Sequence, residues 1–357
     1  MEITALKTLN GTGIESYSVV AEDACFGTAY AIDWIIAEIA ALSGHTLPRA
    51  DRECNTPAIR VSTKQSDPLA EDAFPQEKGD GKAACGEGLC FLRTEGSDVL
   101  VGGSGIMGAL YGAKLLIKQI SSCTDAKTAD TAEPMVRFAN FSKRIREGRE
   151  IRAGFIGDSV TFGYGPVVAW PILLAELTEL AYPQARLSVC NAAESGTKSL
   201  WAAERIEELL LDSGYHDLVF IATGTNDRYA LGYSPSLTYE DSLENYLSMI
   251  RQVRKANPES EIALVLIGRD FEAQALMGQG FEPSPFIPAM LEAARQTGVP
   301  IIDPTSSLGA HCMKETPRDP WYAGWRTYMQ HDDVHPNMDG QEFYAAVVWK
   351  YLSRQGP

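Results

Sequence analysis

The second half of the chain alternates short hydrophobic runs with amphipathic stretches. The runs predict buried strands, and apolar residues at three- and four-residue spacing predict helices between them. Strands are expected at 152–156, 186–189, 217–221, 261–267 and 300–302, and helices include 202–211, 242–256, 288–296 and 340–353. Strands that alternate with helices in this way predict an α/β fold with a parallel sheet covered on both faces.

The first half alternates in the same way on a smaller scale. Strands are expected at 17–20, 58–61, 89–92 and 99–101, and helices at 29–42 and 106–120. Polar, glycine-rich and acidic residues predict an exposed loop over 63–90, and small polar residues at 121–134 indicate a linker. The sequence therefore predicts a smaller α/β domain at 1–120, a linker at 121–139 and a larger domain at 140–357.

Polar residues follow the expected strands of the second half, at the edge where parallel α/β sheets bind ligands. Three blocks come after successive strands: Gly157-Asp158-Ser159-Val160, then Asn191 with Gly196, then Gly224-Thr225-Asn226-Asp227. A fourth, Asp332-Asp333-Val334-His335-Pro336, stands before the last expected helix. A hydroxyl, a glycine, an amide and a carboxylate–imidazole pair are the groups that acyl transfer through a serine ester requires.

These four blocks resemble those of the SGNH (GDSL-type) hydrolase superfamily, which is named for its Ser, Gly, Asn and His. Residues 140–357 fit the pattern, and the segment 145–161 is similar to that of bacterial carbohydrate esterases in this group. The resemblance implies a three-layer α/β/α fold and ester hydrolysis without a metal or organic cofactor. Val160 stands where Leu or Ile is commoner, a difference that should not affect the chemistry.

The resemblance implies a catalytic triad. Ser159 attacks the ester carbonyl, and His335 takes its proton and later gives it to the leaving alcohol. Asp332 holds the His335 ring, and the neighbouring Asp333 is a competitor that the family spacing disfavours. Taken alone, Ser159 is better explained as the cap of the following helix, and His335 is also explained as a solvated loop residue. The presence of all four blocks favours the catalytic roles.

The resemblance also implies an oxyanion hole. Its donors would be the backbone N–H groups of Ser159 and Gly196 and the side-chain amide of Asn226. Gly196 and Asn226 are alternatively ordinary turn residues. Their positions after buried strands favour the oxyanion role.

Residues that contact the substrate are less well defined by the sequence. Trp321 and Trp325 lie upstream of the fourth block and would form a wall for a sugar ring or acyl group, or pack in the core. Arg228 and Arg269 follow the third and fourth strands and are candidate carboxylate binders or surface residues. Asp227 is expected to bond the loop backbone and is a further candidate for substrate binding.

The first half carries a second resemblance. Its residues 29–47, 59–61, 87–89 and 99–112 follow the order found in the small α/β accessory domain of family 20 hexosaminidases and α-glucuronidases. The resemblance covers about residues 3–120 and implies a mainly structural domain. Because such domains accompany sugar-processing enzymes, it favours a carbohydrate substrate.

The composition narrows the range of partners, metal sites and cellular locations that the sequence allows. The chain has 31 Lys and Arg against 47 Asp and Glu, and the formal net charge of −16 disfavours nucleic acid and anionic membranes as partners. No apolar run is long enough to span a bilayer, and no secretory signal is visible. Seven scattered Cys and five His lack metal-ligand spacing, so no metal site is expected. These features predict a reduced, cytoplasmic protein, unless a signal has been removed.

The sequence therefore predicts a two-domain serine esterase for short-chain esters, with O-acetyl groups on a carbohydrate as the preferred substrate. Two alternatives stay open. One is a thioesterase, lipase-like esterase or acyltransferase that acts on a non-sugar ester. The other is a carbohydrate-binding protein without catalysis. The acyl group, the alcohol and the oligomeric state are not defined by the sequence.

Overall fold

The fold is taken from a computed structural model of the 357-residue chain. The residues described are 8–9, 12–21, 26–51, 53–54, 57–63, 90–95, 97–103, scattered positions in 109–120, 138–212, 216–229, 235–269, 272–274 and 284–353. Most of the expected loop at 63–90 and of the expected linker at 121–139 lies outside them. The chain divides into two compact units, Met1–Ala132 and Glu133–Pro357.

The larger unit is built on a five-stranded parallel sheet in the order β12–β11–β10–β8–β9. Its strands are β8 (Glu150–Gly157), β9 (Arg186–Asn191), β10 (Leu218–Ala222), β11 (Glu261–Val265) and β12 (Ile301–Ile302). Every residue of β10 is buried, as expected for a central strand covered on both faces. The predicted α/β fold with a parallel sheet is confirmed.

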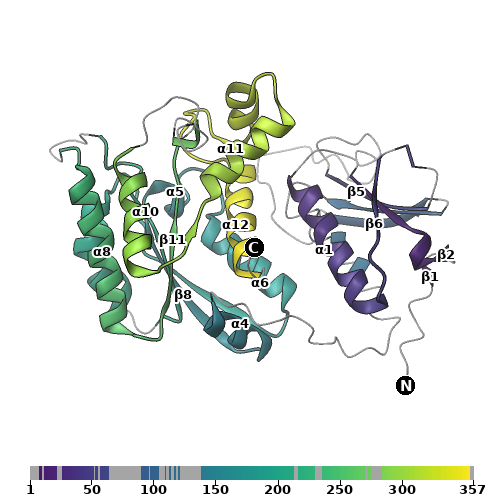
Figure 1. Ribbon diagram of the computed structural model, residues 1–357, viewed down its shortest axis with the longest axis horizontal. Coiled ribbons are helices and arrows are strands. Elements are labelled where there is room, and N and C mark those ends of the chain that lie inside the picture. Colours follow the sequence, from purple (N-terminus) through teal and green to yellow (C-terminus); the bar gives the residue numbers. More distant parts are fainter. Residues whose placement is uncertain are drawn as a thin grey trace. The chain divides into compact units, whose positions relative to one another are not determined.

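Helices cover both faces of this sheet (Figure 1). They are α4 (Ala139–Arg146), α5 (Ser159–Phe162), α6 (Trp170–Ala181), α7 (Ser199–Ile206), α8 (Tyr239–Ala256), α10 (Phe286–Thr297), α11 (Pro304–Glu315) and α12 (Met338–Ser353). A π-helical turn, Glu207–Leu211, extends α7, and two further turns, Pro320–Gly324 and Trp325–Tyr328, follow α11.

Alternating side chains of β10 separate the two layers of core. Val219 and Ile221 pack in the cluster formed with α7, α8 and α10. Phe220 points to the opposite face, where its ring stacks on Phe155 at 4.7 Å and meets Trp170 of α6 edge-on at 5.9 Å. This two-residue period, apolar on both sides, explains why the strand is a continuous hydrophobic run.

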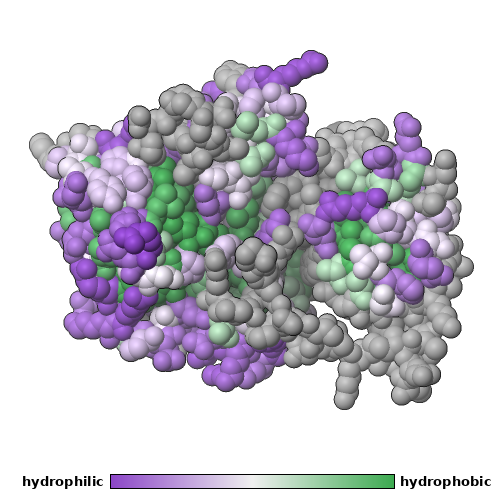
Figure 2. All heavy atoms as spheres, in the orientation of Figure 1, coloured by the Kyte–Doolittle hydropathy of each residue, from purple (hydrophilic) through white to green (hydrophobic). Residues whose placement is uncertain are grey.

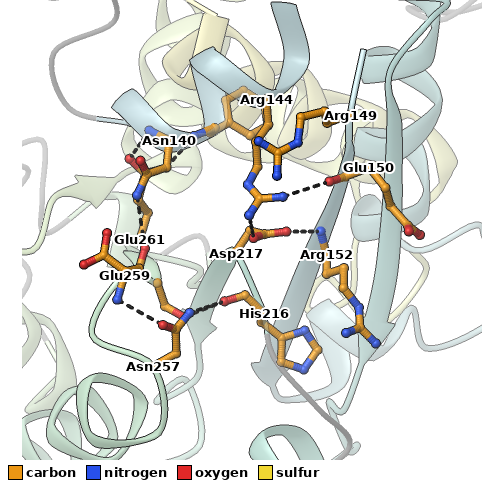
Figure 3. A network of polar contacts seen from close by, with 12 residues as sticks. Asn140, Arg144, Arg149, Glu150, Arg152, His216, Asp217, Asn257, Glu259 and Glu261 are labelled. Atoms are coloured by element: carbon orange, nitrogen blue, oxygen red, sulfur yellow. Dashed lines mark hydrogen bonds and ion pairs between the residues drawn. The ribbon is translucent and has the colours of Figure 1, made fainter. Parts of the chain in front are cut away.

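Polar contacts tie the amino ends of the strands to α4 (Figure 3). The buried Asp217 accepts a hydrogen bond from the backbone N–H of Arg152 at 2.9 Å and pairs with Arg144 of α4 at 2.8 Å. Glu261 accepts from two backbone N–H groups in the first turn of α4, at 2.9 and 2.8 Å. The N-cap residue of α4, Phe138, makes no side-chain hydrogen bond to the first turn. Glu261 therefore accepts from these backbone donors instead. The network lies at the edge of the sheet opposite the carboxyl ends.

The smaller unit has its own five-stranded sheet, in the order β4–β3–β5–β7–β6. Four strands are parallel, β3 (Ser18–Ala21), β4 (Arg49–Ala50), β5 (Ala58–Thr63) and β7 (Asp98–Gly103), and β6 (Cys90–Glu95) is antiparallel to β7. The other elements are α1 (Phe26–Ser43), the strand pair β1 (Thr8–Leu9) and β2 (Thr12–Gly13), and a turn at Ile14–Ser16. The predicted smaller α/β sheet is thus present.

Glycine lets the expected helix at 106–120 approach this sheet closely. The helical residue Gly112 faces β7, and a Cβ placed on it would lie 2.6 Å from the carbonyl oxygen of Gly102. Any side chain at this position would have to move the strand. The rest of this helix is described only at scattered positions.

Hydrophilic residues cover much of the larger unit on the face seen in Figure 2, with a band of hydrophobic residues between α10 and α12. The large hydrophobic side chains that are most exposed among the described residues are Phe162, Tyr164, Ile172, Leu200 and Leu291. Within the described ranges, no helix combines the length and apolar character needed to cross a bilayer.

Candidate active site

The candidate nucleophile lies directly after β8, an inner strand of the sheet. Asp158 accepts a hydrogen bond from the backbone N–H of Val160 at 3.1 Å and so caps α5, whose first residue is Ser159. In the sheet, β8 lies between β9 and β10. After β8 the chain forms β9 on one side and then crosses to form β10 on the other side. Ligands bind at such a switch point in α/β sheets, and Ser159 is 8% exposed there.

Three side chains form a continuous line of hydrogen bonds at this edge. His335 Nε2 lies 2.8 Å from Ser159 Oγ, and His335 Nδ1 lies 2.7 Å from Asp332 Oδ2. Ser159 and His335 are 176 positions apart in the sequence, and only the fold brings them together. A base within hydrogen-bond reach of a hydroxyl, itself oriented by a carboxylate, is the arrangement of an activated serine nucleophile.

Asp332, and not Asp333, is the carboxylate that orients His335. Asp332 Oδ1 also accepts from the backbone N–H groups of Val334 and His335, both at 3.0 Å. Partial burial tends to raise the pKa of Asp332, but its hydrogen bonds with His335 and Val334 outweigh this and lower the pKa to about 2. Asp333 turns the other way and forms a two-point pair with Arg326. The carboxylate of Asp332 is therefore charged at any pH at which the protein would act.

The expected oxyanion donors lie around Ser159. Gly196 has a φ of +78°, a left-handed conformation that favours glycine, although a Cβ there would meet nothing within 4 Å. Asn226 is 9% exposed, and its amide donates one hydrogen bond to the carbonyl oxygen of Thr197 at 2.9 Å. Because an amide carries two N–H donors, this bond fixes its orientation and leaves a second donor. The bond also links the loop after β10 to the loop that holds Gly196.

The expectation that Asp227 contacts substrate is wrong. Its side chain is fully buried and accepts hydrogen bonds from the backbone N–H and the hydroxyl of Ser199, at 2.9 and 2.6 Å, and from the hydroxyl of Ser242 at 2.8 Å. With this set of donors, Asp227 joins the loop after β10 to α7 and α8. It supports the neighbouring Asn226 from behind, the structural role that the sequence also suggested.

Trp325 is likewise not available to a substrate. Its side chain is 1% exposed and belongs to the core, because the turn Trp325–Tyr328 folds inward against α12. Trp321 is half-buried, with its ring centroid 6.5 Å from that of Trp325. The role of Trp321 in substrate binding stays a prediction.

The two candidate arginines lie beyond the carboxyl ends of β10 and β11, bound to neighbouring side chains. Arg228 Nη1 lies 3.4 Å from the hydroxyl of Ser284 and 4.0 Å from the buried carboxylate of Glu272. Arg269 donates to the hydroxyl of Tyr229 at 3.3 Å, and its guanidinium lies 4.7 Å from the centroid of that ring. Their expected role as carboxylate binders stays a prediction.

One residue at the site was missed by sequence reasoning. The ring of Tyr164 lies against the imidazole of His335, with centroids 4.5 Å apart and planes 36° apart, yet its side chain is 48% exposed. The signal available was its position, five residues after Ser159 and between two glycines.

Asp158 is a buried acid directly beneath the nucleophile. Burial raises the pKa of Asp158 from 3.8 to about 7. The hydrogen bond from Val160 acts to lower this pKa, and the charge of Asp227 acts to raise it. Its Oδ2 has no hydrogen-bond partner among the described residues. Asp158 thus holds a proton in the folded protein at pH values where the unfolded chain has lost it. Folding stability must therefore fall as pH rises from about 4 to about 7.

We expect Asp158→Asn to remove the loss of folding stability that the raised pKa of the buried Asp158 causes as pH rises. Asparagine keeps the acceptor for Val160 and carries no charge, so the variant should gain stability over the wild type. The gain should be about 2 kcal/mol larger at pH 8 than at pH 5. Urea unfolding at the two pH values measures it, with the exposed Asp212→Asn as a matched control. An equal effect of Asp158→Asn at both pH values would contradict the assignment.

Metal ligation is not indicated by the described part of the chain. No group of three or more His, Cys, Asp or Glu side chains in it is arranged to hold a metal ion.

Several known proteins are similar to the larger part of this chain. Thioesterase 1/protease 1/lysophospholipase L1 of Escherichia coli strain K12 is 28% identical over 199 residues, which are 55% of this chain and 81% of that protein. Among solved structures, a two-domain esterase active on acetylated mannans matches with 22% identity and a TM-score of 0.45. That match covers 61% of this chain and 52% of the other, so it spans about half of that esterase. An acetyl xylan esterase matches with 19% identity and a TM-score of 0.46, over 56% of this chain and 98% of the other.

A family model also matches the part of the chain that carries the site. It describes the GDSL-like Lipase/Acylhydrolase family and matches residues 155–343, from β8 into α12. The match includes Ser159, Gly196, Asn226, Asp332 and His335. With the parallel sheet and the hydrogen-bonded triad on its carboxyl edge, the chain belongs to the GDSL-like lipase/acylhydrolase family of ester hydrolases.

Proposed function

We propose that the protein is a serine esterase that hydrolyses short-chain esters, with O-acetyl groups on a carbohydrate as its substrates. The observation that carries the proposal is the line of hydrogen bonds from Asp332 through His335 to Ser159. It supplies a nucleophile, a base and a group that orients the base.

The reaction proceeds in two halves. His335 Nε2 takes the proton of Ser159 as the oxygen attacks the ester carbonyl, and the tetrahedral intermediate forms. The C–O bond to the alcohol then breaks, and His335 gives its proton to the alcohol oxygen. In the second half a water molecule loses a proton to His335 and attacks acyl-Ser159, and the acid is released as Ser159 regains its proton. Asp332 stabilises the imidazolium in both halves.

Charge that develops on the carbonyl oxygen needs donors aimed at it. The proposal assigns these donors to the backbone N–H groups of Ser159 and Gly196 and to the second N–H of Asn226. Each such donor is worth about 3–4 kcal/mol of transition-state stabilisation in comparable sites. The bond from Asn226 to Thr197 supports this role, because it holds the amide in place before substrate arrives.

Two features support a carbohydrate ester over other esters. The net charge of −16 disfavours substrates that carry phosphate or bind at anionic lipid surfaces. The resemblance of residues 1–120 to the accessory domain of hexosaminidases and α-glucuronidases associates the chain with enzymes of sugars. That resemblance remains a prediction.

A second candidate has its own support. The Escherichia coli relative is named as a thioesterase and lysophospholipase, and its match covers most of that protein. The same triad would cleave a thioester or a lipid ester, because the chemistry at the acyl carbon is shared.

The experiment is a comparison of acyl release across substrates. The purified full chain is given acetylated xylo- and manno-oligosaccharides, p-nitrophenyl acetate, an acyl thioester and a lysophospholipid. We expect a higher kcat/KM on the oligosaccharide acetates than on the aryl ester. Preference for the thioester or the lysophospholipid would replace the proposal with the second candidate, and equal use of all esters would remove its carbohydrate part.

A further inference from the structure

An aromatic side chain is held against the catalytic imidazole while remaining open to solvent. Tyr164 lies with its ring centroid 4.5 Å from that of His335, and its side chain is 48% exposed. The tilted contact with the imidazole, with ring planes 36° apart, covers part of the phenol ring. The accessible area therefore lies on the rest of the side chain, directly beside the triad.

The local backbone fixes Tyr164 in this position. Its N–H donates to the carbonyl oxygen of Ser159 at 3.0 Å, and its own carbonyl oxygen accepts from the side chain of Gln330 at 2.6 Å. Gln330 also donates its backbone N–H to the carbonyl oxygen of His335 at 2.7 Å. One glutamine thus links the turn of Tyr164 to the loop of His335.

The glycines on either side of Tyr164 make this turn possible. Gly163 and Gly165 have φ values of +84° and +96°, a region that favours glycine. A Cβ on Gly165 would lie 2.6 Å from the Gln330 side chain. The positive φ values of the two glycines and the close approach of Gly165 to Gln330 therefore define the position of Tyr164.

A second exposed ring lies on the same short helix as the nucleophile. Phe162 is 53% exposed and ends α5, three residues after Ser159. Residues three apart share a helix face, so Phe162 emerges on the side of α5 where Ser159 lies. Two of the most exposed large hydrophobic side chains of the described residues thus lie within five residues of the nucleophile.

The position of Tyr164 assigns it to one part of the ester. During the reaction His335 passes a proton to the oxygen of the leaving alcohol, so the alcohol must lie next to the imidazole. Two of the three proposed oxyanion donors, Gly196 and Asn226, lie on the loops after β9 and β10. A ring in contact with the His335 imidazole is therefore next to the alcohol.

We propose that Tyr164 and Phe162 form a binding platform for the sugar ring of the leaving alcohol, which packs its C–H face on the exposed aromatic surface. This inference rests on the proposed function and deepens it, because it names the residues that select a sugar alcohol. Aromatic side chains offer flat apolar faces, and the Tyr164 hydroxyl provides a polar edge for sugar hydroxyls. A platform of isolated rings suits a rigid ring better than an extended acyl chain.

The test compares two acetates that differ only in the alcohol. An acetylated xylo-oligosaccharide offers a sugar ring to the platform, and ethyl acetate offers none. Tyr164→Ala is expected to lower the ratio of their kcat/KM values about tenfold, mostly through KM for the sugar ester. Phe162→Ala should lower the same ratio by a smaller factor. The deacetylated oligosaccharide should also inhibit Tyr164→Ala more weakly than the wild type.

Two variants serve as controls. Tyr164→Phe keeps the ring and should keep the ratio within about twofold. Leu291→Ala removes a side chain of matching exposure from α10, far along the sequence, and should leave both substrates unchanged. If Tyr164→Ala does not fold, Tyr164→Leu tests the loss of the ring with an apolar side chain retained.

The outcomes separate this inference from the proposed function. Equal losses on both acetates would overturn the platform, since Tyr164 would then act only through His335. A wild-type rate on both acetates in Tyr164→Ala would overturn it as well. A wild type that releases acetate from ethyl acetate but not from sugars would overturn the proposed function, and the platform with it.

Discussion

Ser159→Ala should lower kcat/KM for an acetyl ester by roughly 10⁴- to 10⁶-fold, the scale found when a triad nucleophile is removed. Without Oγ there is no group to form the acyl-enzyme, and His335 has no proton to take. Residual hydrolysis would come from substrate binding and the oxyanion donors alone. Initial rates with p-nitrophenyl acetate measure the loss, and circular dichroism checks that the variant is folded.

A matched serine variant makes this result specific. Ser307 lies on α11, where its hydroxyl donates to the carbonyl oxygen of Asp303 at 2.7 Å. Ser307→Ala should keep nearly the whole wild-type rate. Similar rates for Ser159→Ala and the wild type would remove Ser159 from the mechanism.

Asp332→Asn should lower kcat by about 10²- to 10⁴-fold with little change in KM. The amide cannot replace the carboxylate that accepts from His335 Nδ1 at 2.7 Å and that stabilises the imidazolium. An asparagine is also able to turn its own N–H₂ group toward Nδ1, which favours the wrong tautomer. Steady-state kinetics on the same aryl ester separate kcat from KM.

The adjacent residue offers the matched control. Asp333→Asn removes the exposed pair with Arg326, which is worth less than about 1 kcal/mol to stability. Asparagine tolerates the left-handed backbone of this position, where φ is 58°. Its kcat should stay within about threefold of the wild type. A larger loss in Asp333→Asn than in Asp332→Asn would reverse the assignment of the two carboxylates.

The sequence predicted the strands of the larger unit well, because the inner strands β8, β10 and β11 are mostly apolar and buried. Both ends of every expected strand lie within two residues of the corresponding ends of the observed strand. The helices named from the sequence did not include α6, where seven of twelve residues are buried, including all four of its leucines. A helix that is apolar on most of its surface lacks the stripe that reveals amphipathic helices.

The triad was predictable because its residues follow strand ends in a fixed order. The side chains around it were not, because their environments depend on contacts across the fold. The buried state of Asp227 results from Ser199 and Ser242, which are 28 and 15 positions away. The position of Tyr164 depends on a turn between two glycines and on Gln330, 166 positions further along the chain.

Hydrolysis is expected to pass through an acyl group on Ser159. The most direct measurement mixes the wild type with p-nitrophenyl acetate, quenches it rapidly in acid and locates the acetyl group by peptide mass spectrometry. We expect acetylation of Ser159 in the wild type, much slower acetylation of Ser159 in His335→Ala because the base that activates the hydroxyl is missing, and no adduct in Ser159→Ala. Hydrolysis by an enzyme whose Ser159 stays unmodified, or acetylation of another residue at the rate of turnover, would contradict it.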